Sequence, residues 1–160
     1  SWVMRIPGEA VSKGVEAFHG AGRRMEFKGT YHGAQVYDDY AHHPDELRAT
    51  LEAIRSMGDH RLVLAFQPHT YTRTKLLMDD FIRELKKADV VVLAEIYAAR
   101  ESNTIGISSA DLAAQIPGSI YCETLQDVTE TLRKIVKEGD IVVTMGAGDI
   151  FRAGEALLAE

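Results

Sequence analysis

The stretch RLVLAFQPHTYTRTKLLMDDFIRELKKADVVVLAEIY, residues 61–97, decides the fold. It opens with an apolar run at 61–66 and closes with another at 90–97, and such nearly continuous apolar runs are typical of strands covered on both faces. Between them, the segment 72–89 has apolar residues at helical spacing, namely Leu77, Phe81, Leu85 and Ala88. A strand, one helix and a second strand predict a βαβ unit with parallel strands and a right-handed crossover.

The same alternation continues on both sides of this unit. Further strands are predicted at 141–146 and 119–123, and further helices within 43–58 and 124–139. The apolar stripes of these helices are Leu47, Leu51 and Ile54 in the first, and Leu125, Val128, Leu132 and Ile135 in the second. The sequence therefore predicts an α/β domain with a doubly wound, mostly parallel, Rossmann-like sheet and helices on both faces.

Both ends of the helix within 43–58 have typical residues. Pro44 suits its first position, Asp45 and Glu46 suit the positive end of the helix dipole, and Gly58 suits its end.

The first part of the chain does not follow the alternation. Val11, Val15 and Phe18 predict one short helix, which a glycine-rich break separates from an edge strand. We interpret residues 1–24 as a connector or the tail of a preceding domain, and 25–160 as the α/β domain.

Composition narrows the class of protein. The 160 residues carry a net charge of −6, with 46% hydrophobic and 26% charged residues, as in an ordinary globular domain. No Lys/Arg block points to nucleic acid, and no apolar run approaches the roughly 18 residues of a membrane span. Cys122 stands alone, which excludes an internal disulfide and a multi-cysteine zinc site. Because the start of the chain also lacks a signal-peptide core, we expect a cytoplasmic protein.

Polar residues follow four of the predicted strands. In an open parallel sheet, ligands bind beyond the carboxyl ends of the strands, so these loops are expected to meet at one edge. They are VYDDYAHHPDE (36–46), QPHTYTR (67–73), AARES (98–102) and GAGD (146–149). Their chemically capable side chains are His42, His43, His69, Arg73, Arg100, Glu101 and Asp149.

Each of these motifs has a structural interpretation beside the functional one. Asp39 is able to bond the backbone of a turn, and His42 or His43 to cap a helix. A metal site at HHPDE is disfavoured, since adjacent residues point in different directions. His69 and Arg73, four residues apart, form either an anion receptor on one helix face or a solvated surface. GAGD lacks the full dinucleotide fingerprint, and no Walker A loop is present.

Five motifs in this order and spacing carry a family resemblance: GRRMEFKG, DDYAHHPDE, FQPHTYTRT, YAARE and TMGAGDI. Together they resemble the C-terminal domain of the Mur ligases, and most closely that of the member that joins L-alanine to UDP-N-acetylmuramate. Residues 1–24 are similar to the end of the central domain of that enzyme. The member that recycles murein peptides shares the D-x-A-H-H-P stretch but is not expected to have FQPH.

The resemblance implies a bacterial, cytoplasmic, ATP-dependent ligase of peptidoglycan synthesis. ATP phosphorylates the carboxylate of UDP-N-acetylmuramate, and the amine of L-alanine then attacks the acyl phosphate. The phosphate loop and most of the Mg²⁺ ligands belong to the central domain, which is a partner of this domain together with the N-terminal one. No catalytic residue is therefore expected in this chain alone, and the chain alone is expected to be inactive.

The resemblance also assigns site residues. Arg24 resembles the arginine that reaches the nucleotide phosphates, although Arg23 is an alternative; Asp39 resembles the ribose contact, and Tyr40 lies beside it. For the substrate, His42 resembles a cleft residue facing adenine or the amino acid, His69 and Arg73 match the receptor of the L-alanine carboxylate, and Ala147 lines the cleft with its backbone. Thr70 departs from the arginine of many relatives, which leaves more of the carboxylate binding to Arg73.

Two other classes of protein stay open. One is a non-catalytic nucleotide-binding module without a ligase partner, and the other is a metal-dependent hydrolase built on HHPDE, for which the sequence shows no further ligands.

Overall fold

The computed structural model describes residues 22–159, which form a single six-stranded sheet in the order β1-β2-β6-β3-β4-β5. Every neighbouring pair of strands is parallel except β1 and β2, which are antiparallel. The predicted edge strand is thus β1, and the prediction of a mostly parallel sheet is confirmed. The strands are β1 (Glu26–Tyr31), β2 (Ala34–Asp39), β3 (Leu62–Phe66), β4 (Val90–Ala94), β5 (Ile120–Cys122) and β6 (Ile141–Met145).

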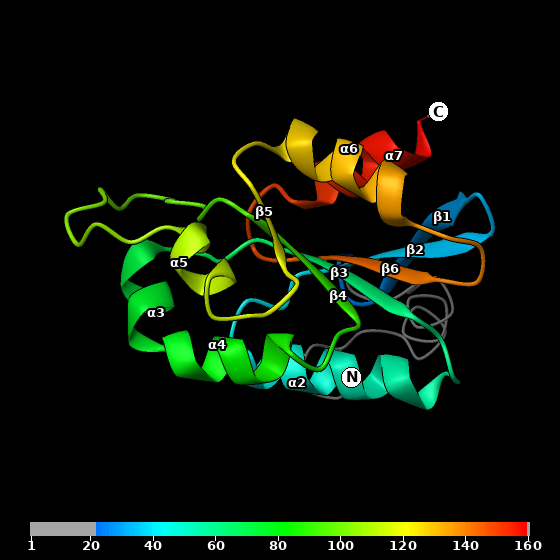
Figure 1. Ribbon diagram of the computed structural model, residues 1–160, viewed down its shortest axis with the longest axis horizontal. Coiled ribbons are helices and arrows are strands. Elements are labelled where there is room, and N and C mark those ends of the chain that lie inside the picture. The colour runs from blue at the N-terminus through cyan, green and yellow to red at the C-terminus, as the bar shows by residue number, and fades with distance from the viewer. Residues whose placement is uncertain (1–21, 160) are drawn as a thin grey trace, which may run out of the picture.

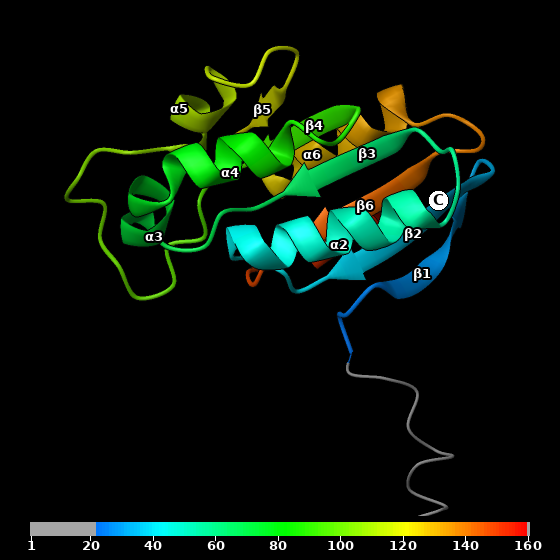
Figure 2. The same ribbon diagram turned by 90° about the horizontal axis from the view of Figure 1, so that it is seen from below.

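Helices cover both faces of the sheet (Figure 1). They are α2 (Pro44–Ser56), α3 (Tyr71–Leu76), α4 (Met78–Leu85), α5 (Ser109–Ala113), α6 (Leu125–Ile135) and α7 (Phe151–Leu158). The helices α2 and α4 lie side by side on one face, as Figure 2 shows, and α6 and α7 lie on the other. Alternate residues of β3 serve the two cores: Leu62, Leu64 and Phe66 pack toward α2 and α4, and Val63 and Ala65 toward α6 and α7. The doubly wound prediction is confirmed.

The helix α2 forms where the sequence predicts it. His43 is its N-cap, with Asp45 N donating to His43 Nδ1 and Glu46 completing a capping box. Pro44 occupies the first turn, and the stripe Leu47, Leu51 and Ile54 is buried. The α-helix ends at Ser56, two residues before Gly58.

The single helix predicted over 72–89 is wrong, because it is divided at Leu77 into α3 and α4. Leu77 has φ −109° and ψ 22°, yet it donates to Arg73 O and accepts from Phe81 N, so the chain bends without losing its bonds. Phe81 and Leu85 are fully buried and hold α4 on the sheet, whereas the N-cap of α3, Thr70, donates to Tyr97 O in the loop after β4. The bend allows α4 to pack on the sheet while Thr70 stays bonded to the loop after β4. The spacing of apolar residues alone does not reveal it.

The short helix predicted at Val11, Val15 and Phe18 lies outside the described residues. The helices α5 and α7 were not predicted. Within residues 22–159, no helix has both the length and the apolar character needed to cross a membrane.

Candidate functional site

Four strand-end loops lie side by side at the carboxyl edge of the sheet. In the register of the strands, Met145 of β6 pairs with Asp39 on one side and Phe66 on the other, and Phe66 pairs with Leu93 of β4. The predicted convergence of the loops after β2, β6, β3 and β4 is therefore confirmed. Beyond the strands, His69 and Tyr97 form an isolated parallel bridge that carries the β3–β4 pairing further.

Aromatic rings form a row along this edge. The centroids of Tyr40 and His42 are 5.5 Å apart, those of His42 and His69 5.8 Å, and those of His69 and Tyr97 5.6 Å, the last pair being stacked. Tyr40 and Tyr97 are 37% and 38% exposed, so both ends of the row are open to a ligand.

Gln67 fixes the GAGD loop, and sequence reasoning missed it. Its Oε1 accepts from Asp149 N at 3.0 Å and from Ile150 N at 3.1 Å, while Nε2 donates to Asp149 Oδ1 at 3.1 Å. A Cβ at Gly148 would clash with Gln67 Oε1 and with the Tyr97 side chain, so glycine is required there. A buried amide directly after an apolar strand was the available signal. Ala147, a predicted cleft residue, lies within this loop and is partly buried.

Arg23 and Arg24 have different surroundings. Arg23 Nε donates to Asp38 Oδ2 at 2.7 Å, and its two terminal nitrogens donate to the carbonyls of Gly148 and Gly146. Arg24 has a half-exposed side chain whose ion pair with Glu46 is 3.9 Å long. Arg23 therefore ties the start of the domain to the GAGD loop, and Arg24 has a guanidinium free enough to reach a ligand.

Asp39 holds the backbone around it. It is 3% exposed; its Oδ1 accepts from Ala41 N at 2.7 Å and its Oδ2 from Met25 N at 2.8 Å. Oδ1 thus closes the turn after β2, and Oδ2 joins the end of β2 to the segment before β1. These bonds are those of a residue that stabilises a turn, which is one of the two roles that the sequence left open for Asp39.

His69 and Arg73 do not share a helical face as expected. His69 precedes α3, and Thr70 between them has φ 69° and ψ 142°, a rare conformation for a β-branched residue. Even so, His69 Nδ1 and one terminal nitrogen of Arg73 are both buried without a hydrogen-bond partner in the described part of the chain. Burial, together with the nearby Arg73 and His42, lowers the pKa of His69.

An open pocket of about 490 Å³ lies at the start of α3. Its lining consists of His43, Thr70, Thr72, Arg73, Leu76, Leu77 and Glu101. Glu101, from the loop after β4, accepts from Thr72 N at 2.9 Å and from the Thr72 hydroxyl. These two bonds lower the pKa of the Glu101 carboxyl, so it is ionised at neutral pH. Buried polar atoms without partners and an open pocket indicate a ligand site at this edge.

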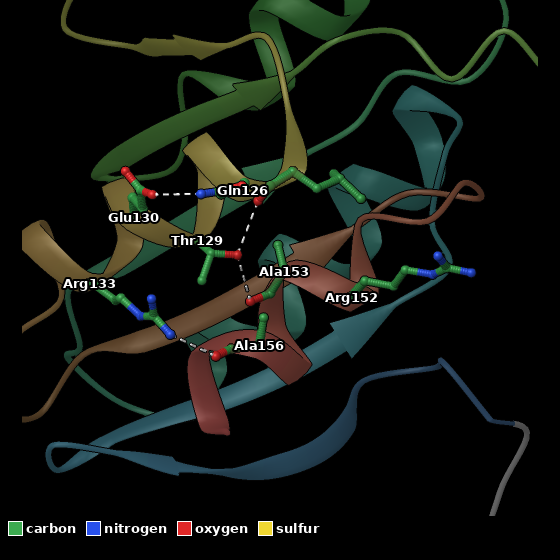
Figure 3. A pocket seen from close by; sticks show the side chains of 8 residues that line it. Gln126, Thr129, Glu130, Arg133, Arg152, Ala153 and Ala156 are labelled. Carbon is green, nitrogen blue, oxygen red and sulfur yellow. Dashed lines mark hydrogen bonds between the residues drawn. The ribbon is translucent and has the colours of Figure 1, made fainter. Parts of the chain in front are cut away.

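A second pocket, of about 400 Å³, lies between α6 and α7 (Figure 3). Most of its polar groups bond to one another or to the backbone: Thr129 donates to Leu125 O and Ala153 O, Arg133 to Ala156 O, and Gln126 to Glu130. Arg152 points away from these groups, and its guanidinium lies over the Phe151 ring. We therefore do not place the function there.

The described residues contain no group of three or more His, Cys, Asp or Glu side chains placed to hold a metal ion.

Known proteins with similar sequences and structures identify the family. The family model described as "Mur ligase, glutamate ligase domain" matches residues 23–148. A UDP-N-acetylmuramate–L-alanine ligase from Lachnospira eligens is 50% identical over 97% of this chain and 35% of its own length. Further curated relatives, 40% to 46% identical, carry the same name.

Solved structures agree on the fold. The UDP-N-acetylmuramate–alanine ligase of Thermotoga maritima superposes with a TM-score of 0.73 at 24% identity, covering 98% of this chain and 34% of that one. A separately solved domain from Haemophilus ducreyi gives a TM-score of 0.66 at 23% identity, covering 84% of this chain and 97% of that one. This chain spans about a third of the length of the curated relatives it matches. It belongs to the Mur ligase family, whose C-terminal domain it represents.

Proposed function

We propose that this chain is the C-terminal domain of an ATP-dependent ligase that joins L-alanine to UDP-N-acetylmuramate in peptidoglycan synthesis. In the proposal, the carboxyl edge of its sheet receives the amino acid at one end and the nucleotide at the other. The names of the relatives, at up to 50% identity, supply the substrates.

The observation that carries the proposal is the unpartnered pair at the start of α3. A buried guanidinium nitrogen without an acceptor is costly, and a carboxylate from the ligand would remove that cost. Arg73 supplies the charge, and His69, kept neutral by its lowered pKa, supplies either a donor or an acceptor at Nδ1. L-Alanine fits this receptor, with His42 beside it in the ring row.

The nucleotide is assigned to the other end of the row. Arg24, whose guanidinium lies over the Tyr40 ring, offers a charge to a phosphate, and the exposed part of the Tyr40 ring offers adenine an aromatic surface. Asp39 shapes the turn between them, and its predicted contact with the ribose remains to be tested. Ala147 lines the same edge.

ATP, when bound, supplies the phosphoryl group that activates the muramate carboxylate. This domain has no phosphate loop, and its described residues offer no cluster of metal ligands, so the proposal assigns the phosphates and Mg²⁺ mainly to the central domain. The N-terminal and central domains of the same protein are the proposed partners. A reaction that consumes ATP and a nucleotide sugar belongs in the bacterial cytoplasm.

A ligation assay tests the proposal. We expect the full-length protein that carries this domain to release ADP only when both UDP-N-acetylmuramate and L-alanine are present, and the 160-residue chain alone to release none. Release with a murein peptide, but not with L-alanine, would favour the recycling ligase instead. ATP binding by a full-length protein without any ligation would favour a nucleotide-binding module.

A further inference from the structure

The pocket at the start of α3 carries charges of both signs. Arg73 lines it from the helix and Glu101 from the loop after β4. The Glu101 carboxylate accepts from the Thr72 N–H and hydroxyl, whereas one terminal nitrogen of Arg73 has no hydrogen-bond partner within residues 22–159. The two charges therefore face one pocket without neutralising each other.

A fixed carboxylate in this place is unfavourable for a simple anionic ligand. Like charges in a partly desolvated pocket repel more strongly than in water, so Glu101 opposes the attraction of Arg73 for a ligand carboxylate. The repulsion is offset if the ligand also carries a cation beside its carboxylate. An α-amino acid does so at neutral pH, because one carbon atom separates its ammonium from its carboxylate.

We infer that Glu101 is a specificity-determining residue that selects the zwitterionic amino acid, whose carboxylate binds Arg73 while its ammonium faces Glu101. This inference rests on the proposed function and adds the group that recognises the amine. Leu76 and Leu77, which line the same pocket, leave an apolar surface for a small side chain. Plain carboxylates and dicarboxylic acids are then excluded by charge.

The competing role for Glu101 is that of a structural cap. Its bonds to the Thr72 N–H and hydroxyl fix the first turn of α3 and thereby place Arg73. Glu101→Gln separates the two roles, because an amide oxygen still accepts from Thr72 N while the negative charge is lost. Loss of a cap weakens every ligand of Arg73 equally, whereas loss of a selecting charge weakens zwitterions and strengthens plain carboxylates.

The experiment measures, in the full-length enzyme, the KM for L-alanine and the inhibition constant of propionate, which has the carboxylate without the amine. We expect Glu101→Gln to raise the alanine KM and to lower the propionate inhibition constant, so that their ratio changes by about tenfold or more. Glu101→Asp, which keeps the charge, is expected to retain a ratio near that of the wild type. Asp79→Asn, an exposed acid on α4, is the control for a general change in charge.

Parallel changes in the two constants, or none, would overturn the inference and leave Glu101 as a cap. If Glu101→Gln does not fold, Thr72→Val provides the test, since it removes one capping bond and keeps the charge. We expect that variant to leave both constants near their wild-type values, because the selecting charge is kept; a parallel rise of both constants would assign Glu101 to the cap and overturn the inference. The proposed function fails separately, if the wild-type enzyme does not use L-alanine or if Arg73 does not affect its KM.

Discussion

Asp39 shows how one carboxylate can organise the edge on which a site depends. Its two oxygens accept from Met25 N and Ala41 N, and the side chain is almost fully buried. Each oxygen has a lone pair left, but a ribose hydroxyl would have to reach it on a side chain that is only 3% exposed. The geometry therefore favours a role in the fold over direct contact with the ribose.

Asp39→Asn tests this assignment. An amide has one acceptor and one donor, so it leaves one of the two buried N–H groups unpaired, at a cost of about 1–3 kcal/mol of unfolding free energy. We expect urea unfolding of the chain to show that loss, and the full-length enzyme to keep its kcat/KM for ATP. An unchanged stability with a reduced kcat/KM for ATP would instead restore the ribose contact.

His69 makes a prediction about pH. Its lowered pKa arises from burial first and then from Arg73 and His42, with Glu101 acting in the opposite direction. An NMR titration should give a midpoint below the ordinary value of about 6.5, moving up in Arg73→Ala and further down in Glu101→Gln. As the pH falls, His69 takes up its proton in the unfolded chain before it does so in the folded chain, because its pKa is lower in the folded chain. The contribution of His69 to stability is therefore complete above about pH 6.5 and declines as the pH falls. A midpoint at or above 6.5 would contradict the effect of burial, Arg73 and His42 on the pKa of His69.

The identity of site residues could be predicted from the sequence, but not their orientation. Arg23 and Arg24 are adjacent and chemically equal, and only the fold shows that Arg23 is bonded to Asp38 and the GAGD loop. The bonds to the GAGD loop join residues more than a hundred positions apart, which no local pattern encodes. For the same reason, the sequence left open whether Asp39 serves the turn or the ribose.

At the scale of elements, the loop after β6 depends on a close fit. Gln67 bonds to Asp149 and Ile150, and Gly148 has no room for a side chain beside Gln67 and Tyr97. This fit places three strand-end loops against one another.

Gly148→Ala is therefore expected to destabilise the domain by about 1–3 kcal/mol, since the added methyl meets Gln67 and the Tyr97 ring at less than contact distance. Gly22→Ala is the matched control, because among residues 22–159 a Cβ there meets just Glu26 Oε2, at 3.8 Å. Urea unfolding of both variants makes the comparison. Equal stability of the two would show that the loop adapts freely.

Elements with strong periodicity and good caps were predictable, and those shaped by distant contacts were not. The helix α2 carries its own proline, acidic first turn and buried stripe, so its local sequence suffices. The bend at Leu77 and the conformation of Thr70 follow from the bond between Thr70 N and Tyr97 O across the sheet edge. That bond depends on the β3–β4 pairing and is not visible in residues 72–89 themselves.

At the scale of the whole molecule, strand order brings the site together. β6, the last strand in the chain, is inserted between β2 and β3, so the GAGD loop lies between the two histidine-containing loops. The alternation of strands and helices predicted the parallel sheet and its functional edge. It did not predict the position of β6. The chain reaches this position from β5 through α6, which crosses the face of the sheet opposite to α2 and α4.

We propose that this edge receives the amino acid of a ligase, and the KM values of Arg73→Ala in the full-length enzyme decide whether it does. Loss of a charge-assisted contact of about 1.5–3 kcal/mol should raise the KM for L-alanine by roughly one to two decades while the KM for ATP changes far less. Lys75→Ala, an exposed cation on the same helix, should leave both constants near the wild-type values. An unchanged alanine KM in Arg73→Ala would contradict the claim and make Arg73 a residue of the helix surface only.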